Sequence, residues 1–125
     1  VFQSEVLFDA GSANIGDEGQ AQLAQIAIAL TEIIDQIPKD IPWILQIDGH
    51  TDNVPVSGVY ADNWDLSTER ALSVVRFMIK SGVPASRLSA SGYGEFQPIA
   101  TGNTDTDRQK NRRIELKLTQ RVQSE

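Results

Sequence analysis

Residues 43–52 read WILQIDGHTD, an apolar run that gives way to small and polar residues. Trp43 to Ile47 has the length and apolarity of a strand, which predicts a buried central strand. The loop from Thr51 to Asn63 that follows is longer than most connections in compact domains, and long ordered loops are often functional. Asp52, at the start of this loop, is therefore the first candidate for a site residue.

Helical spacing replaces strand spacing on both sides of this segment. After Gly16, apolar residues recur at intervals of three and four up to Ile37, with Asp17 as the expected N-cap. The same spacing predicts a second helix over residues 66–81, and Gly82 signals its end.

Three more strands complete the predicted order. They are expected at Val6 to Phe8, at Arg87 to Tyr93 and at residues 113–118, where apolar and charged residues alternate. The order β-α-β-α-β-β predicts an α/β (α+β) sandwich, in which helices pack on one face of a mixed sheet. The last two strands are expected to form an antiparallel edge.

Composition indicates one soluble globular domain over residues 1–125. With 40% hydrophobic and 22% charged residues the usage is ordinary, and the lack of cysteine excludes disulfides and thiolate metal sites. A net charge of -6, with basic residues concentrated near the end of the chain, argues against nucleic-acid binding. The chain begins with Val1 rather than Met, so a fragment is expected, and any membrane contact would involve an upstream segment.

Asp48, His50 and Asp52 occupy alternate positions and invite a metal-site interpretation. In a strand they would share one face, as a metal-dependent hydrolase would require. However, His50 is the only histidine, and Thr51 and Asp52 are expected to lie in the loop. The hydrolase is therefore the alternative rather than the favoured interpretation.

Other chemistries find weaker support. Residues 103–107, NTDTD, resemble the start of a calcium loop, but the required glycine and glutamate are replaced by Arg108 and Ile114, which favours a polar turn. Neither a glycine-rich phosphate loop nor a Gly-x-Ser-x-Gly elbow is present in the sequence.

A carboxylate and a guanidinium remain, Asp52 after the central strand and Arg70 in the expected first turn of the second helix. They would either form a salt bridge across the loop or recognise a zwitterion, with Asp52 binding an ammonium and Arg70 a carboxylate. Backbone N–H groups of residues 66–68 would reinforce the anion's side of such a site.

Five sequence blocks occur in order along the chain: LFDxGSA at 7–13, GHTD at 49–52, NxxLSxxRAxxV at 63–74, GxGExxP at 92–98 and NRRIE at 111–115. Together, with their spacing, these blocks resemble the OmpA-like peptidoglycan-binding domain. Within that family, the long loop and the sequence NWDLS at residues 63–67 are most similar to the MotB-like branch of flagellar-type stators.

The resemblance implies noncatalytic binding of the peptide stem of peptidoglycan, through the zwitterionic end of meso-diaminopimelate, without a cofactor. Asp52 would bind the ammonium and Arg70 the carboxylate. Asn63 and the backbone of Leu66 and Ser67 would line the pocket, with Thr51 shaping the turn.

Three further positions receive roles by resemblance and by strand alternation. Arg112 shares the face of Ile114 and is expected near the site, whereas Arg113 is expected to face solvent. His50 is expected to pack or hydrogen-bond rather than to contact the ligand. Residues 54–61 are expected to alter access to the site or to make a contact of their own.

The resemblance also implies a setting. The domain would be the C-terminal part of a membrane-anchored protein in the periplasm of a Gram-negative bacterium, anchored in the inner membrane or alternatively in the outer membrane. It would form a homodimer, and the full-length protein would work with a MotA-like channel partner. The remaining alternative is an oligomerisation module without a glycan ligand.

Overall fold

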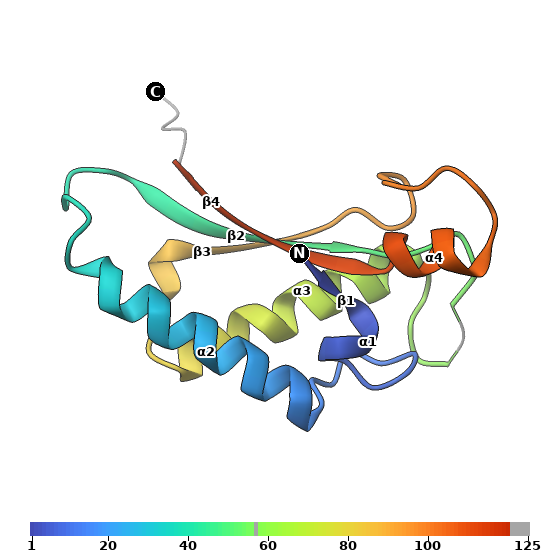
Figure 1. Ribbon diagram of the computed structural model, residues 1–125, viewed down its shortest axis with the longest axis horizontal. Helices are drawn as coiled ribbons and strands as arrows, with labels where there is room; N and C mark the ends of the chain where they lie inside the picture. Colours follow the sequence, from blue (N-terminus) through green and yellow to red (C-terminus); the bar gives the residue numbers. More distant parts are fainter. Residues whose placement is uncertain (57, 121–125) are drawn as a thin grey trace.

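The computed structural model describes residues 1–56 and 58–120 and shows a sheet with helices beneath it (Figure 1). In chain order the elements are β1 (Phe2–Gln3), α1 (Ser4–Leu7), α2 (Asp17–Ile34), β2 (Trp43–His50), α3 (Asn63–Lys80), the 3-10 helix η1 (Ala85–Arg87), β3 (Leu88–Gly92), α4 (Asp105–Asn111) and β4 (Arg113–Gln120).

The four strands lie in the order β1-β4-β2-β3. β2 pairs in parallel with β3 and antiparallel with β4, so the mixed sheet is confirmed. The expected antiparallel edge is wrong, because β4 lies inside the sheet between β1 and β2 and does not pair with β3. This arrangement places the start of β4 directly beside the end of β2, through the pair Arg113 and His50.

Two long helices cover one face of the sheet, as expected (Figure 1). Their apolar sides meet the inward-facing residues of β2 and β4 in a single core. Side chains alternate between the two faces of β2. Leu45 and Ile47 point toward the helices, whereas Asp48 and His50 lie on the opposite face. The sandwich is thus specified by period 2 in the strands and period 3.6 in the helices.

The start of the chain differs from the expectation. Val6 and Leu7 belong to the last part of the single-turn helix α1, and the strand is the two-residue β1 that pairs with Arg113 and Ile114 of β4. Phe8 forms only an isolated bridge with Ile15. A short apolar run fits a strand or a buried helical turn equally well, so periodicity could not separate them.

Helix α3 begins three residues earlier than expected and lies very close to the sheet. Asp62 caps it by accepting a hydrogen bond from the backbone N–H of Asp65. Gly49 of β2 permits the close packing, because a Cβ atom there would lie only 2.1 Å from the carbonyl oxygen of Ser67. The missing side chain therefore fixes the separation between β2 and α3.

The polar segment expected as a turn contains helix α4. Thr104 accepts a hydrogen bond from the backbone N–H of Asp107, and the Asp107 carboxylate accepts one from the backbone N–H of Thr104. This reciprocal capping box stabilises a helix of only seven residues. The helix leads directly into Arg112 and β4.

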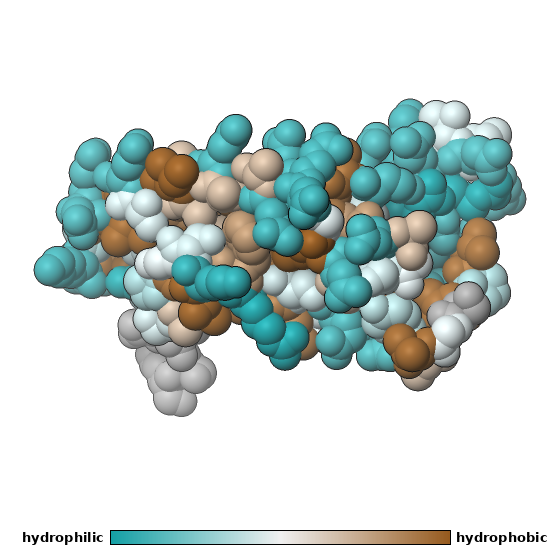
Figure 2. All heavy atoms as spheres, turned by 90° about the horizontal axis from the view of Figure 1, so that it is seen from below, coloured by the Kyte–Doolittle hydropathy of each residue, from teal (hydrophilic) through white to brown (hydrophobic). Residues whose placement is uncertain are grey.

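The outer surface of the helix layer is mostly hydrophilic, with separate small apolar patches (Figure 2). Ile28 and Ile33 of α2 are among the apolar residues that remain exposed. Within residues 1–56 and 58–120, no helix combines the length and apolarity needed to cross a membrane.

Candidate functional site

A cleft of about 350 Å³ opens where β2 ends and the long loop begins. Residues from four separate segments line it, including the expected Thr51, Asp52, Asn63, Leu66, Arg70 and Arg112. Six of the seven candidate residues are therefore brought together. The other lining residues are Gly11, Val54, Pro55, Val56 and Arg108.

Asp52 lies just beyond the end of β2, as expected, and is 8% exposed. Its Oδ1 accepts the backbone N–H of Val54 at 3.0 Å, and its Oδ2 accepts Arg112 Nη1 at 2.7 Å. An ionised carboxylate has about four lone-pair positions, so roughly half of its accepting capacity is left for a ligand.

Arg70 lies eight residues into α3, because the helix begins at Asn63, and not in its first turn as expected. Its Nε donates to the carbonyl oxygen of Ser12 at 2.8 Å, and its guanidinium lies 5.0 Å from the centre of the Phe8 ring. No other hydrogen bond to this guanidinium occurs among the described residues, so both terminal nitrogens remain available. Burial lowers the pKa of Arg70, yet an arginine so far above neutral pH stays cationic.

The direct salt bridge between Asp52 and Arg70 is not formed within the part of the chain that the structure describes. Arg112 takes the place of Arg70 beside the carboxylate, and its Nε also donates to Glu5 at 2.5 Å. Burial alone would lower the pKa of Arg112, but the hydrogen bonds to Asp52 and Glu5 raise it overall. Arg112 is thus held at the site, where strand alternation had placed it.

Two polar residues shape the turn that presents Asp52. Thr51 donates through Oγ1 to the carbonyl oxygen of Asp52, and its backbone N–H donates to that of Gly94. Asn63 donates through Nδ2 to the carbonyl oxygens of Asp52 and Val54 at 3.3 and 3.2 Å. Both residues line the cleft and also fix its backbone.

The expected contribution of residues 66–68 is changed by the early start of α3. The backbone N–H of Leu66 already donates to the carbonyl oxygen of Asp62, so the unpaired helix N–H groups lie earlier. Leu66 lines the cleft through its side chain, whereas Ser67 is fully buried and does not line it. The Ser67 hydroxyl instead accepts the backbone N–H of Gly94.

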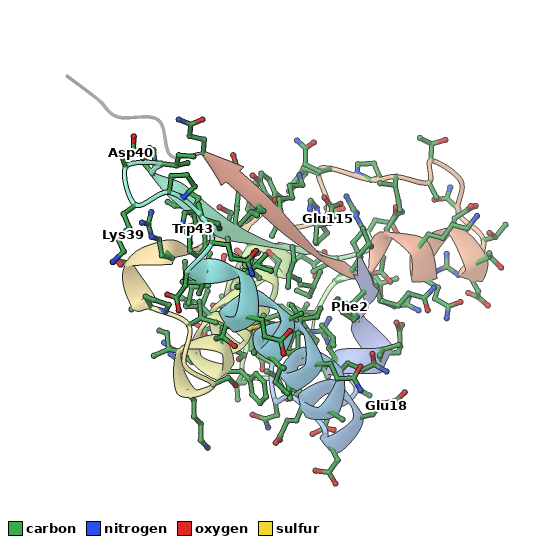
Figure 3. The ribbon with its side chains drawn as sticks, turned by 60° about the vertical axis from the view of Figure 1, so that its left-hand side comes forward. Phe2, Glu18, Lys39, Asp40, Trp43 and Glu115 are labelled. Atoms are coloured by element: carbon green, nitrogen blue, oxygen red, sulfur yellow. The ribbon has the colours of Figure 1, made fainter. Side chains whose placement is uncertain are left out.

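The expectation that Arg113 faces solvent is wrong, because this side chain is only 3% exposed. It lies on the face of the sheet opposite the helices, where it donates to Glu115 at 2.6 Å and to the carbonyl oxygen of Gln97 at 2.9 Å. Figure 3 shows Glu115 on β4 above the helix layer. The segment around Gln97 covers this end of the sheet, so its outer face is not open to water there.

His50 packs on this outer face and does not line the cleft. Its ring stacks on Tyr93, with centroids 5.0 Å apart and planes 7° from parallel. Burial, followed by the nearby charge of Arg113, lowers the pKa of His50. Because Asp52 turns into the cleft toward Arg112, the alternating set Asp48, His50 and Asp52 does not converge, and the hydrolase built on it is not favoured.

Sequence reasoning missed three residues at or near the cleft. Glu5 received no role, and Arg108 was assigned to a polar turn, because helices α1 and α4 are too short to show a clear period. Tyr60 accepts the backbone N–H of Ala13 through its hydroxyl, so the long loop does make a contact of its own. A signal for Arg108 existed in the capping-box spacing of Thr104 and Asp107.

The cleft juxtaposes one partly free carboxylate, that of Asp52, with the guanidinium groups of Arg70, Arg108 and Arg112. Such a surface is complementary to a small ligand that carries both charges, since each charge would meet its complement at a fixed position. The fold and the site together define a mixed α/β domain with a charged cleft at the end of β2.

The OmpA family model matches residues 7–112. Motility protein B of Bacillus subtilis is 34% identical over 125 residues, which cover 98% of this chain and 45% of that protein. The chain belongs to the OmpA family, and its similarity includes MotB-like members.

Solved structures agree with this assignment. The periplasmic domain of Helicobacter pylori MotB has a TM-score of 0.81 at 29% identity, covering 96% of this chain and 74% of that chain. The cell wall anchor of the T6SS from Pseudomonas aeruginosa has a TM-score of 0.79 at 32% identity, covering 91% and 75%. The chain spans less than half the length of the Bacillus subtilis relative.

Proposed function

We propose that this domain binds peptidoglycan without catalysis, by holding the zwitterionic end of a meso-diaminopimelate stem peptide in the cleft. The observation that carries the proposal is the placement of Asp52, Arg70 and Arg112 around one cleft of about 350 Å³. Family membership supports the ligand class, since a relative of the same fold is a cell wall anchor. Asp52 would accept the ammonium, and the terminal nitrogens of Arg70 would grip the carboxylate.

A single site of this size should bind weakly. Few groups are buried on association to offset the lost freedom of motion, so a dissociation constant of roughly micromolar to millimolar is expected. Many copies along one polymer then supply avidity. Retention on whole sacculi and binding of a soluble stem peptide must therefore be measured separately.

The central experiment compares wild type with Asp52→Asn and Arg70→Ala. A charge-assisted hydrogen bond is worth about 1.5–3 kcal/mol, so each change should weaken binding of a soluble diaminopimelate peptide by about 10- to 150-fold. The matched controls are Asp40→Asn, an exposed carboxylate before β2, and Arg76→Ala, an exposed arginine on α3. Unchanged sacculus retention and peptide affinity in both site variants, with the fold intact by circular dichroism, would refute the site.

Selectivity tests the ligand itself. A stem peptide with lysine in place of diaminopimelate lacks the distal carboxylate, so wild type should prefer the diaminopimelate peptide and Arg70→Ala should lose this preference. Equal binding of both peptides by wild type would overturn the assignment of diaminopimelate as the ligand. Peptidoglycan binding itself would then be decided by the sacculus assay.

We extend the proposal to the whole protein through its MotB-like relatives. The domain would lie in the periplasm of a Gram-negative bacterium as the C-terminal part of an inner-membrane stator protein, with a MotA-like channel partner and a homodimeric state. Light scattering of the isolated domain tests the dimer, and co-purification of the full-length protein from membranes tests the channel partner. A monomer at high concentration, or the absence of a channel subunit, would contradict the respective extension.

A further inference from the structure

The outer face of the sheet carries a buried polar cluster that the peptidoglycan proposal does not use. Asp48 is paired across the sheet with Glu115, and the next pair on the same face of the sheet joins His50 to Arg113. Asp48 is fully buried, His50 is 5% exposed and the Glu115 side chain is 16% exposed. Ionisable groups at this depth need partners, because removing them from water is costly.

His50 lacks such a partner. Both ring nitrogens are buried, and neither has a hydrogen bond within residues 1–56 and 58–120. One face of the ring is taken up by Tyr93, and Nε2 lies 3.8 Å from Glu115 Oε2, which is beyond hydrogen-bond distance. The imidazole therefore has unused nitrogens, and one of them, Nε2, lies beside the Glu115 carboxylate.

The three side chains can supply converging ligand atoms. One ligand atom from each of Asp48, His50 and Glu115 lies within 4.8 Å of the other two. In a tetrahedral zinc site with bonds of about 2.0–2.1 Å, ligand atoms are roughly 3.3 Å apart. Side-chain movements of about 0.5–1.5 Å would therefore complete the geometry.

A cation already lies at this position. Lys117 Nζ bridges Asp48 Oδ2 at 3.4 Å and Glu115 Oε1 at 3.2 Å, yet its side chain is 55% exposed. These contacts raise the pKa of Lys117, with the hydrogen bond to Glu115 as the main cause. A flexible, half-exposed ammonium can move into solvent and leave both carboxylates to another cation.

We propose that Asp48, His50 and Glu115 form a structural site for a divalent transition metal such as Zn²⁺, which takes the position of the Lys117 ammonium. Imidazole and carboxylates suit such ions, and a water on the Lys117 side would complete four-coordination.

The remaining neighbours support the ligands. Gln46 donates to both oxygens of Asp48 at 2.8 and 3.0 Å, and Arg113 donates to Glu115 Oε2. These hydrogen bonds orient the carboxylates in the way that outer partners of metal ligands do.

The metal would join β2 to β4 directly behind the cleft. His50 immediately precedes Thr51 and Asp52, and Glu115 follows Arg112 by three residues. The site would therefore stiffen the strand ends that carry Thr51, Asp52 and Arg112. It requires none of the cleft side chains as ligands, so its failure and the failure of the peptidoglycan proposal are independent.

The test uses protein without a histidine tag, stripped by a chelator and titrated with ZnCl₂ by calorimetry. One equivalent of zinc should bind, and a hundredfold excess over the dissociation constant should raise the melting temperature by roughly 8–13 °C. His50 is the only histidine, so nitrogen NMR of its ring reports directly on coordination. An unshifted ring in the presence of millimolar zinc would overturn the proposal.

Two variants act in opposite directions. His50→Phe keeps an aromatic ring on Tyr93 but removes the ligand, so zinc affinity should fall at least about tenfold. Lys117→Met removes the competing cation, so affinity should rise roughly fivefold. Asp105→Asn, at an exposed carboxylate, is the control and should change nothing. Zinc binding that survives His50→Phe and is not tightened by Lys117→Met would assign the metal to another place.

Discussion

Gly49→Ala tests whether the packing of α3 on β2 sets both stability and the cleft. A Cβ atom at this position would lie 2.1 Å from the Ser67 carbonyl oxygen, whereas ordinary contacts begin near 3.4 Å, so the helix and strand must separate by about 1.3 Å. The obstructing atom belongs to the backbone and cannot rotate away. Overpacking of a core costs typically about 1–3 kcal/mol, and we expect the upper end or more of that range here.

The same displacement carries Arg70 on α3 away from Asp52 at the end of β2. We therefore expect a lower midpoint of urea denaturation and a weaker affinity for the stem peptide in the protein that remains folded. Gly16→Ala is the control: its Cβ would meet only the flexible Asp9 carboxylate, at 3.2 Å. Substitutions on the surface usually change the free energy of unfolding by less than about 0.5 kcal/mol. A change no larger than this in Gly49→Ala would refute the argument.

Two further predictions concern α4 and the segment that it holds. Asn111 accepts hydrogen bonds from the backbone N–H groups of Ile99 and Ala100 and donates one to the carbonyl oxygen of Ala100. Asn111→Ala should therefore lower the free energy of unfolding, measured by urea denaturation, by about 2–3 kcal/mol. A decrease below about 0.5 kcal/mol would contradict this prediction. The hydrogen bonds from the Thr104 side chain, and then from its backbone, lower the pKa of Asp107. A lowered carboxyl pKa stabilises the folded state at pH values above the unfolded pKa of 3.8, and this stabilisation is lost as the pH falls through the folded pKa. Carbon NMR titration should therefore show a higher pKa for Asp107 in Thr104→Val than in wild type, and an identical pKa in both would show that the capping box is not formed in solution.

The central strand and the two long helices could be predicted because each spans enough residues to show its period. The same argument located Asp52, which lies where a buried strand must end. Arg70 was found through its spacing from the loop, although the start of its helix was misplaced by three residues. Long helices and strands with one buried face can be predicted from the sequence, because their apolar residues recur with a measurable period.

The misassigned parts depend on tertiary partners. β1 has two residues and exists only because Arg113 and Ile114 of β4 pair with it. Arg113 is buried because Glu115 and the segment at Gln97 accept its hydrogen bonds, a compensation that alternation alone cannot show. The pairing of β1 with β4 and the hydrogen bond from Arg113 to Gln97 join residues far apart in the sequence, so no local pattern indicates them.

The pairing of β1 beside the cleft has a mechanical consequence. A pull applied at Phe2 would enter β4 at Ile114, and the next contact, from the Ser4 N–H to the Arg112 carbonyl oxygen, lies at a residue of the proposed binding site. Tension between the start of the domain and a ligand held in the cleft would therefore follow a path of a few residues. The hydrophobic core beneath the sheet would lie beside this line of force rather than along it, so a tether could bear load without drawing the helices off the sheet.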